Sequence, residues 1–165
     1  MALKLILTRH AKSSWSMPTL SDHDRPLNKR GRESAKALGD WLRGENMQPD
    51  QVLTSSAQRT LETFDLMGFD LAPESFPELY LAEAVTMLHV LKQAKGSKVM
   101  MIGHNPGNGE FAQRLAAKLP SHPRFLDYPT GATTVFNFNI DHWQDVAFGT
   151  GNVEEFVIPR ELVRT

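Results

Sequence analysis

The chain has 165 residues, a length typical of one domain, and its 41% hydrophobic and 22% charged residues are typical of a folded globular protein. Its 18 basic and 19 acidic residues leave a formal net charge of −1, which excludes nucleic-acid or membrane binding through overall charge. The absence of cysteine excludes disulfides, thiolate metal clusters and a cysteine nucleophile. We therefore expect one domain over residues 1–165, with no nucleic-acid and no membrane partner.

The N-terminal sequence does not resemble an export signal. Its apolar run is short, contains Lys4 and is followed by Arg9 and His10, unlike a signal peptide. No apolar run approaches the roughly 18 residues that are needed to cross a bilayer. Together with the absence of cysteine, these features predict a cytoplasmic location.

Hydrophobic periodicity predicts strands that alternate with helices through the first two thirds of the chain. The apolar run over 3–8 is expected to be a buried strand, and the helix over 28–43 begins at the N-cap Asn28 and stops at Gly44. Ser56 is the expected N-cap of the next helix. The remaining expected elements are a loop over 11–27, a strand over 51–54, a helix from 56 to about 68, a loop over 69–78, a helix around 85–91, a strand over 98–102, a helix around 111–119, a loop over 120–130, and strands over 133–140, 143–148 and 153–158.

This order of elements predicts an α/β fold with a mostly parallel central sheet, helices on its faces and an antiparallel meander at the end. In such sheets, ligands bind outside the carboxyl ends of the strands. Three of these ends carry polar groups, namely Arg9 and His10, Arg59 a few residues beyond the second strand, and His104 with Asn105. We expect these strand ends to converge.

Two histidines and two arginines at converging strand ends are suited to phosphoryl transfer. The guanidinium fork of Arg9 or Arg59 matches phosphate oxygens, and a neutral imidazole from His10 or His104 can act as a nucleophile. Fixed cations then stabilise the charge on the transferring group, which is the main requirement of this chemistry. This arrangement requires no metal, so we expect neither a metal nor a cofactor.

Three ordered motifs carry a family resemblance: Arg9-His10-Ala11, the segment 53–59 (Leu-Thr-Ser-Ser-Ala-Gln-Arg) and the segment 102–107 (Ile-Gly-His-Asn-Pro-Gly). They resemble the histidine phosphatase (phosphoglycerate mutase-like) superfamily, which is named for an Arg-His-Gly motif after the first strand. The segments 7–15 and 21–31 are similar to its small SixA-type branch, described as phosphohistidine phosphatases. The resemblance extends over nearly the whole chain and implies a three-layer α/β/α sandwich.

The resemblance also implies a role for each matching residue. His10 corresponds to the phosphorylated nucleophile, and Arg9 and Arg59 correspond to the two phosphate-binding arginines. His104 corresponds to the second histidine, which contacts the phosphoryl group. In looser correspondence, Ser13 and the backbone N–H of Asn105 lie where further phosphate-binding groups are expected. The predicted phosphate site therefore comprises Arg9, His10, Ser13, Arg59, His104 and Asn105.

Two positions depart from the family pattern or match it loosely. Ala11 replaces the usual glycine of the motif, which predicts an extended rather than a left-handed backbone at this position. Glu83 is the nearest acidic residue in the segment where larger members carry a general acid. We expect it to be either a catalytic acid or a solvated carboxylate near the start of a helix.

Other polar motifs favour structural roles. The sequence Asp22-His23-Asp24 lacks the glycine and the distant glutamate of a calcium loop, so a solvated loop or a hydrogen-bonding anchor is favoured. Arg25 is interpreted as part of the same loop. The glycines at positions 103–109 match neither the dinucleotide nor the P-loop pattern, which excludes a nucleotide-binding loop.

We expect a metal-independent phosphatase that forms phosphohistidine at His10 and releases phosphate to water. Its partner is a phosphorylated substrate, and a phosphohistidine-bearing signalling protein is favoured because the resemblance is to the SixA branch and the chain is too short for the large lids of bigger relatives. A small-molecule phosphomonoesterase is the alternative enzyme, and a mutase is disfavoured because it must shield phosphohistidine from water. A non-catalytic phosphate-binding or interaction module would need the cations but not the nucleophile.

Overall fold

The computed structural model describes residues 2–163, and its centre is a six-stranded sheet in the order β3-β2-β4-β1-β5-β6. Over these residues, no helix has the length and apolar character needed to span a membrane. The strands are β1 (Leu3–Arg9), β2 (Gln51–Ser55), β3 (Glu74–Phe76), β4 (Lys98–Gly103), β5 (Thr133–Phe138) and β6 (Asn152–Val157). The helices are α1 (Lys29–Gly44), α2 (Gln58–Met67), α3 (Ala84–Leu91), α4 (Gly107–Leu115) and α5 (Pro159–Leu162), with short 3₁₀ helices η1 (Asp22–Asp24), η2 (Pro77–Leu79) and η3 (Trp143–Asp145).

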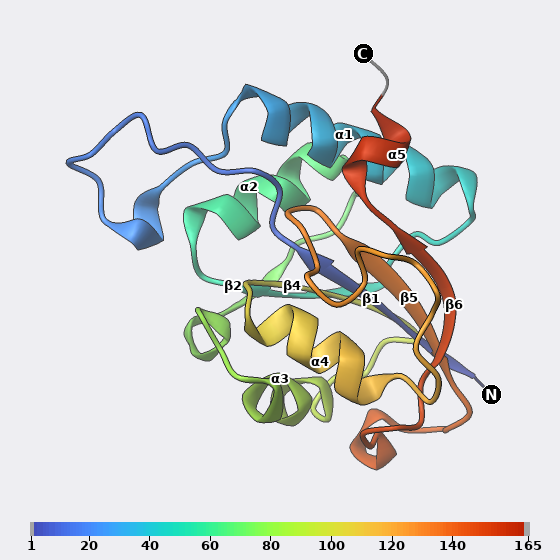
Figure 1. The fold of residues 1–165 in the computed structure, drawn as a ribbon. Helices are drawn as coiled ribbons and strands as arrows, with labels where there is room; N and C mark the ends of the chain where they lie inside the picture. The colour runs from blue at the N-terminus through green and yellow to red at the C-terminus, as the bar shows by residue number, and fades with distance from the viewer. Residues whose placement is uncertain (1, 164–165) are drawn as a thin grey trace.

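Helices cover both faces of this sheet. Strands β3, β2, β4 and β1 are parallel to one another, whereas β5 pairs antiparallel with β1 and β6 pairs antiparallel with β5. Figure 1 shows α1, α2 and α5 on one face and α3 and α4 on the other. The predicted three-layer α/β/α sandwich with a mostly parallel sheet is therefore confirmed.

The apolar run of β1 reflects burial on both faces of the sheet. Leu5 and Leu7 belong to the core on the side of α3 and α4, whereas Ile6 belongs to the core on the side of α1 and α2. None of the three has exposed surface. Fully burying such a side chain stabilises the fold by about 1.5–3 kcal/mol. Strand β1 is therefore held firmly in the sheet and fixes the position of the residues that follow it.

The register of the sheet brings the strand ends that carry polar groups to one edge. Arg9 pairs with Gly103 across β1 and β4, so His10 and His104 each lie one residue beyond this pair. Strand β2 pairs in parallel with β4 and ends at the same edge, and Arg59 lies in the first turn of the helix that follows it. The predicted convergence of the three strand ends is confirmed.

The segment 10–28, which connects β1 to α1, projects beyond this edge and forms the blue loop on the left of Figure 1. Its base is fixed by α1, because the N–H of Asn28 donates to the carbonyl oxygen of Lys12 at 3.0 Å. The Asn28 side chain accepts from the N–H of Gly31 at 2.8 Å, as expected of an N-cap. A Cβ on Gly31 would lie 2.0 Å from the Lys12 oxygen, so only glycine allows this contact.

Two local predictions are wrong in the second half of the chain. The segment 143–148 is not a strand but begins with η3, in which Trp143 is buried and its indole N–H donates to the carbonyl oxygen of Gly96 at 2.6 Å. Helix α4 ends at Leu115 instead of continuing to Leu119, because the chain turns to pair with Gly151. Both deviations depend on contacts with segments distant in the sequence.

Two further predictions fail around β2. Ser56 does not cap α2, since Ala57 occupies the N-cap position and the Ser56 hydroxyl contacts Nε2 of His23 at 2.9 Å. The expected loop over 69–78 contains β3, a three-residue edge strand that pairs in parallel with β2. Its sequence, Glu-Ser-Phe, is too short to show a strand period.

Candidate active site

A cleft of about 380 Å³ opens where the three strand ends meet. Its lining combines basic side chains, two imidazoles and a carboxylate. The lining residues are Arg9, His10, Lys12, Ser13, Trp15, Asp22, Arg25, Arg59, Leu81, His104, Asn105 and Thr130. The cleft thus contains all six residues of the predicted phosphate site.

His10 lines this cleft with only 5% of its surface exposed. Its Nδ1 lies 2.7 Å from the carbonyl oxygen of Ala11, a contact in which the ring N–H donates and the oxygen accepts. In the neutral ring, Nε2 therefore carries the lone pair. Main-chain bonds fix this segment, since the N–H of His10 donates to Gly103 at 3.1 Å and its carbonyl oxygen accepts from Gly131 at 2.9 Å. His10 is thus held as an imidazole with Nε2 available as a nucleophile.

The surroundings of His10 oppose its protonation. Burial lowers the pKa of His10 to about 3, and the positive charges of Arg9, Arg59 and Arg25 act in the same direction. A contact with the Ala11 oxygen partly offsets these effects. The imidazole is therefore neutral, and its lone pair is free, across the physiological pH range.

Arg59 and Arg9 each present a nitrogen without a partner. Arg59 is 3% exposed, and its Nη1 and Nη2 donate to the main-chain oxygen and to Oδ2 of Asp22 at 2.7 and 3.0 Å. Nη1 of Arg9 donates to the carbonyl oxygen of Tyr128 at 3.2 Å. The Nε atoms of both arginines are buried and lack a hydrogen-bond partner within residues 2–163. Because an unsatisfied buried donor costs about 1–3 kcal/mol, an oxyanion bound in the cleft would be stabilised here.

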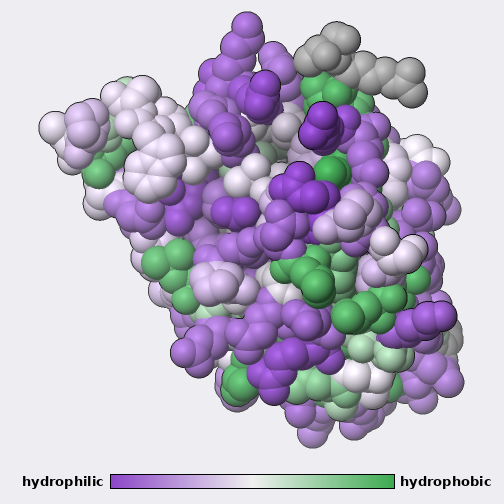
Figure 2. Space-filling model, in the orientation of Figure 1, coloured by the Kyte–Doolittle hydropathy of each residue, from purple (hydrophilic) through white to green (hydrophobic). Residues whose placement is uncertain are grey.

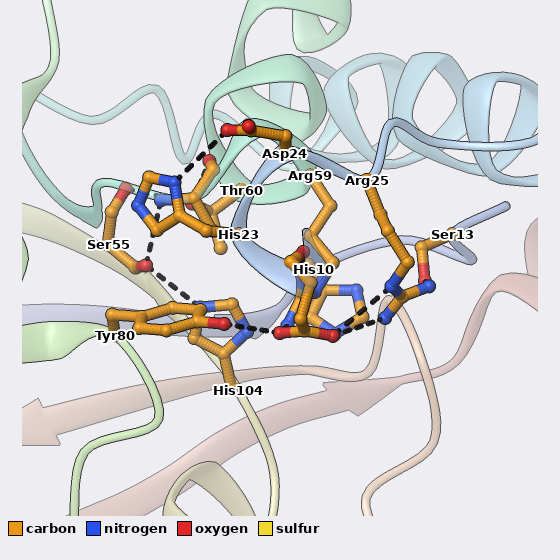
Figure 3. A network of polar contacts seen from close by, with 12 residues as sticks. His10, Ser13, His23, Asp24, Arg25, Ser55, Arg59, Thr60, Tyr80 and His104 are labelled. Atoms are coloured by element: carbon orange, nitrogen blue, oxygen red, sulfur yellow. Dashed lines mark hydrogen bonds and ion pairs between the residues drawn. The ribbon is translucent and has the colours of Figure 1, made fainter. Parts of the chain in front are cut away.

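Asp22 connects the projecting loop to the arginines of the cleft. Its carboxylate accepts hydrogen bonds from Arg59, from Nε of Arg25 at 3.2 Å and from the hydroxyl of Tyr80. Figure 3 labels the three donors Arg59, Arg25 and Tyr80. Arg25 also donates to the hydroxyl oxygen of Ser13 at 2.7 Å. The bond from Tyr80 and those from the arginines lower the pKa of Asp22 to about 2, so the side chain is ionised at neutral pH. Asp22 is therefore a hydrogen-bonding anchor, one of the two structural roles expected for its motif.

His104 lies between His10 and Tyr80. Its ring centroid is 5.3 Å from that of His10 and 5.4 Å from that of Tyr80, which packs edge-on. Nε2 of His104 contacts the hydroxyl of Ser55 at 2.8 Å, whereas Nδ1 is buried with no partner in the described part of the chain. Burial, the adjacent His10 and Arg59 lower the pKa of His104 to about 3. The second histidine is therefore also neutral.

Comparison with known proteins identifies the family. A model of the histidine phosphatase superfamily (branch 1) matches residues 5–84. An uncharacterised protein of Mycobacterium tuberculosis is 32% identical over 160 residues, which cover 92% of this chain and 99% of that protein. The chain belongs to the histidine phosphatase superfamily. The resemblance found in the sequence is thus confirmed, and the protein is a phosphatase.

Solved structures place this phosphatase beside SixA proteins. The SixA protein of Nakamurella multipartitia, described as a candidate phosphohistidine phosphatase, superposes with a TM-score of 0.86 at 27% identity and covers 97% of this chain and 98% of that one. A SixA of the same description from Agrobacterium tumefaciens gives a TM-score of 0.77 at 26% identity, with coverage of 95% and 98%. A protein histidine phosphatase SixA solved with tungstate shares the fold, with a TM-score of 0.78 at 21% identity over 98% of this chain and 100% of that one.

Two weaker sequence assignments fall at the edge of the phosphatase cleft. Ser13 accepts from Arg25 and lies in the loop after β1. The side-chain amide of Asn105 donates to the carbonyl oxygens of Asp127 and Tyr128 at 2.9 Å each, and its oxygen accepts from Gly109 at 3.2 Å. The Asn105 side chain thus stabilises the segment after β4. The group of Asn105 that is expected to contact phosphate is therefore its main-chain N–H.

Glu83 is placed at the N-cap of α3 with an exposed side chain. It is not one of the residues that line the cleft, although Leu81, two positions earlier, is. Among the residues that the structure describes, the carboxylate that lines the cleft is that of Asp22. The structure therefore does not bring Glu83 together with His10 and the arginines in the cleft, and its role as a general acid stays a prediction.

Sequence reasoning missed Arg25 and Trp15, which line the cleft, and Tyr80, which donates to the cleft-lining Asp22. Arg25 is 7% exposed, and its guanidinium lies 3.5 Å from the ring centroid of Trp15. The available signal was the spacing of Asp22 and Arg25, which lie three residues apart and form an ion pair at 3.2 Å across the turn of η1. Tyr80 gave no comparable signal, because its partner Asp22 is 58 residues away.

The described residues also allow a check for metal ligands. Within residues 2–163, no group of three or more His, Cys, Asp or Glu side chains is placed to hold a metal ion. The positive charge beside His10 comes instead from guanidinium groups. The geometry thus offers a nucleophile and cationic hydrogen-bond donors, the two components that phosphoryl transfer requires.

Proposed function

We propose that this phosphatase transfers the phosphoryl group of its substrate to Nε2 of His10 and then to water. In the first step, the Nε2 lone pair forms a bond to phosphorus, and the leaving group departs with the electrons of its own bond. In the second step, water attacks phosphorus, the P–N bond breaks, and inorganic phosphate and neutral His10 result. The proposal rests on one observation above all: three residues that line the cleft beside His10, namely Arg9, Arg59 and His104, each carry a buried nitrogen that lacks a hydrogen-bond partner among residues 2–163.

These nitrogens belong to the side-chain types that bind the oxygens of a tetrahedral oxyanion. Guanidinium N–H groups form strong charge-assisted bonds to phosphate oxygens, and buried donors need little reorganisation when charge develops. Ser13 and the main chain of Asn105 complete the proposed phosphate site at its edge. The tungstate complex of a SixA protein supports this assignment, since tungstate is also a tetrahedral oxyanion.

We further propose that the substrate is phosphohistidine in a protein. The cleft-lining Asp22 is ionised because its hydrogen bonds lower its pKa to about 2, so it cannot deliver a proton to a poor leaving group at neutral pH. A phosphohistidine ring that carries a proton on its other nitrogen leaves as neutral imidazole, and because the pKa of imidazole is near 6.5 this proton can come from water instead of from an acid of the enzyme. The likeness to SixA proteins described as phosphohistidine phosphatases supports the same substrate.

The surface around the cleft also fits a protein substrate. Trp15 and Leu81 line the cleft and are 77% and 54% exposed, and Met17 and Leu20 extend the apolar surface along the loop. Val85, on the first turn of α3, is also exposed. In Figure 2 the loop is the protrusion at the upper left, mostly pale with green atoms, beside a purple surface. Exposed apolar side chains such as Trp15 and Leu81 at an active-site cleft are typical of a surface that contacts another macromolecule.

A substrate panel tests both parts of the proposal. Initial rates would be measured on a protein phosphorylated on histidine with phosphoramidate, on an aryl phosphate and on sugar phosphates, each with and without a chelator. We expect kcat/KM to be highest on the phosphohistidine protein and unchanged by chelation. Faster hydrolysis of a sugar phosphate would favour a small-molecule phosphomonoesterase. Loss of all activity in chelator, restored by a divalent cation, would contradict a metal-independent mechanism.

A further inference from the structure

Ser55 lies at the end of β2 and has no exposed surface. Its hydroxyl oxygen accepts a hydrogen bond from the N–H of Ala57 at 3.1 Å and lies 2.8 Å from Nε2 of His104. Figure 3 shows this contact between Ser55 and the ring of His104. The hydroxyl therefore meets one fixed donor and one ring nitrogen whose role depends on the tautomer.

A proton count distinguishes the two tautomers. If Nε2 of His104 carried the proton, the Ser55 oxygen would accept from both Ala57 and His104, and its own buried O–H would lack an acceptor. If Nδ1 carries the proton, the Ser55 O–H donates to Nε2 and the hydroxyl is fully satisfied. Because an unsatisfied buried hydroxyl is costly, the second arrangement is favoured.

Nδ1 of His104 has no partner among residues 2–163 and is buried in a residue that lines the cleft. As an N–H group it would donate to a phosphoryl oxygen, whereas as a lone pair it would repel that oxygen. We infer that Ser55 is a positioning residue that fixes His104 as the Nδ1–H tautomer, so that His104 donates a hydrogen bond to the transferring phosphoryl group. This inference rests on the proposed function, which places that group in the cleft.

The two histidines would then share one tautomer but present opposite atoms to the substrate. In His10 the Nδ1–H is held by the Ala11 oxygen, which leaves the Nε2 lone pair to attack phosphorus. In His104 the Nε2 lone pair is held by Ser55, which leaves Nδ1–H to bind an oxygen of the same group. Both rings stay neutral because burial lowers their pKa values to about 3, so each tautomer persists at neutral pH.

The direct test is nitrogen-15 NMR of the imidazole rings in the wild-type protein at pH 7. Long-range proton–nitrogen spectra distinguish a protonated from an unprotonated ring nitrogen, and substitution of His104 by Asn identifies its signals. We expect the His104 proton on Nδ1, and we expect added inorganic phosphate to shift this Nδ1 signal. A His104 proton on Nε2 in the wild-type protein would overturn the inference without the use of any Ser55 variant.

Variants of two neighbouring serines provide the functional test. Ser55→Ala should allow the His104 proton to move to Nε2 and lower kcat on an aryl phosphate by about tenfold to a hundredfold, with a smaller change in KM. Ser55→Thr keeps the hydroxyl and should retain the Nδ1 proton and more of the activity than Ser55→Ala. Ser56→Ala is the matched control, because it removes an adjacent hydroxyl whose partner is His23 and which does not line the cleft.

The outcomes separate this inference from the proposed function. If phosphate forms on His10 during turnover but Ser55→Ala leaves both the tautomer and kcat unchanged, the role of Ser55 is wrong and the phosphohistidine mechanism stands. If wild-type His104 carries the proton on Nδ1 but no phosphate forms on any histidine, the tautomer assignment stands and the proposed mechanism is wrong.

Discussion

Asp22 binds Arg59 through both its main chain and its side chain, with Nη1 of Arg59 2.7 Å from the main-chain oxygen and Nη2 3.0 Å from Oδ2. Two other side chains, those of Arg25 and Tyr80, donate to the same carboxylate. An internal anion therefore partly neutralises the arginines that an incoming phosphoryl group must bind. The cleft thereby avoids a cluster of unpaired cations, but the anion opposes the binding of phosphate.

Asp22→Asn should therefore tighten inhibition by inorganic phosphate. The substitution removes one negative charge beside Arg59 and Arg25 and keeps one acceptor oxygen. Because the Asp22 side chain is 42% exposed, solvent screens this charge, and we expect the inhibition constant to fall by about fivefold at low salt. Asp24→Asn is the control, since this neighbour is 67% exposed and pairs with His23 instead. An unchanged constant in Asp22→Asn would contradict the account.

Arg59→Lys should lower kcat/KM far more than a conservative change would suggest. A lysine cannot reproduce the two-pronged contact of a guanidinium with phosphate oxygens. We expect a loss of about 2–4 kcal/mol in transition-state stabilisation, the range for one lost oxyanion donor. The control is Arg114→Lys, which alters an exposed pair with Glu110 on α4. A change below about threefold in Arg59→Lys would place Arg59 outside the catalytic machinery.

The buried neutral histidines predict how stability depends on pH. In the unfolded chain His10 and His104 bind protons below about pH 6.5, whereas burial lowers their folded pKa values to about 3. The unfolded state thus binds more protons between these pH values, so the free energy of unfolding falls as pH drops from about 6.5 toward 3. Each histidine contributes a slope of up to about 1.4 kcal/mol per pH unit.

Denaturant unfolding of wild type and His10→Asn between pH 7 and pH 5 measures this slope. We expect the slope to be smaller in His10→Asn and unchanged in His89→Gln, which alters an exposed histidine of α3. Most of this pH window lies above the range in which carboxylates with ordinary pKa values titrate. Equal slopes in wild type and His10→Asn would show that His10 is not held neutral by the fold.

The sequence was sufficient for the elements whose signals are local. The apolar run of β1 and the Asn28 N-cap mark a strand and a helix start that depend on adjacent residues alone. Trp143 shows the opposite case, because a strand-like segment becomes a 3₁₀ helix when its indole binds the Gly96 oxygen. Ser56 does not cap α2 for a similar reason, since its hydroxyl forms a hydrogen bond with His23 on the distant loop instead.

For the site, motifs predicted the residues that sit directly after strands. His10 and His104 follow β1 and β4, so the parallel register alone brings them together. The position of Tyr80 depends on how the segment before α3 packs against the loop after β1, a long-range arrangement without a local period. The same limit applies to Glu83, whose place in the sequence pattern did not determine whether it reaches the cleft.

Glu83→Gln tests whether a general acid takes part in catalysis. Expulsion of an alkoxide from an alkyl phosphate requires a proton from an acid, a contribution worth about 10²–10⁴-fold, whereas a phosphohistidine ring already protonated on its other nitrogen leaves as neutral imidazole without an acid of the enzyme. Because Glu83 is exposed and does not line the cleft, we expect Glu83→Gln to change kcat/KM on a phosphohistidine protein less than twofold. Glu78→Gln, at an exposed position on η2, is the control. A collapse of about a hundredfold on a sugar phosphate that wild type hydrolyses well would establish Glu83 as the acid and end the phosphohistidine assignment.

The central claim is that His10 becomes phosphorylated during turnover, and mass spectrometry of rapidly quenched enzyme tests it most directly. Wild-type protein mixed with an aryl phosphate, quenched in alkali within the first turnovers and digested, should carry phosphate on the peptide that contains His10. Folded His10→Ala should show neither this phosphate nor measurable hydrolysis, since the substitution removes the nucleophile. Hydrolysis by wild type without phosphate on His10, phosphate on His104 instead, or near-wild-type hydrolysis by His10→Ala would contradict the account.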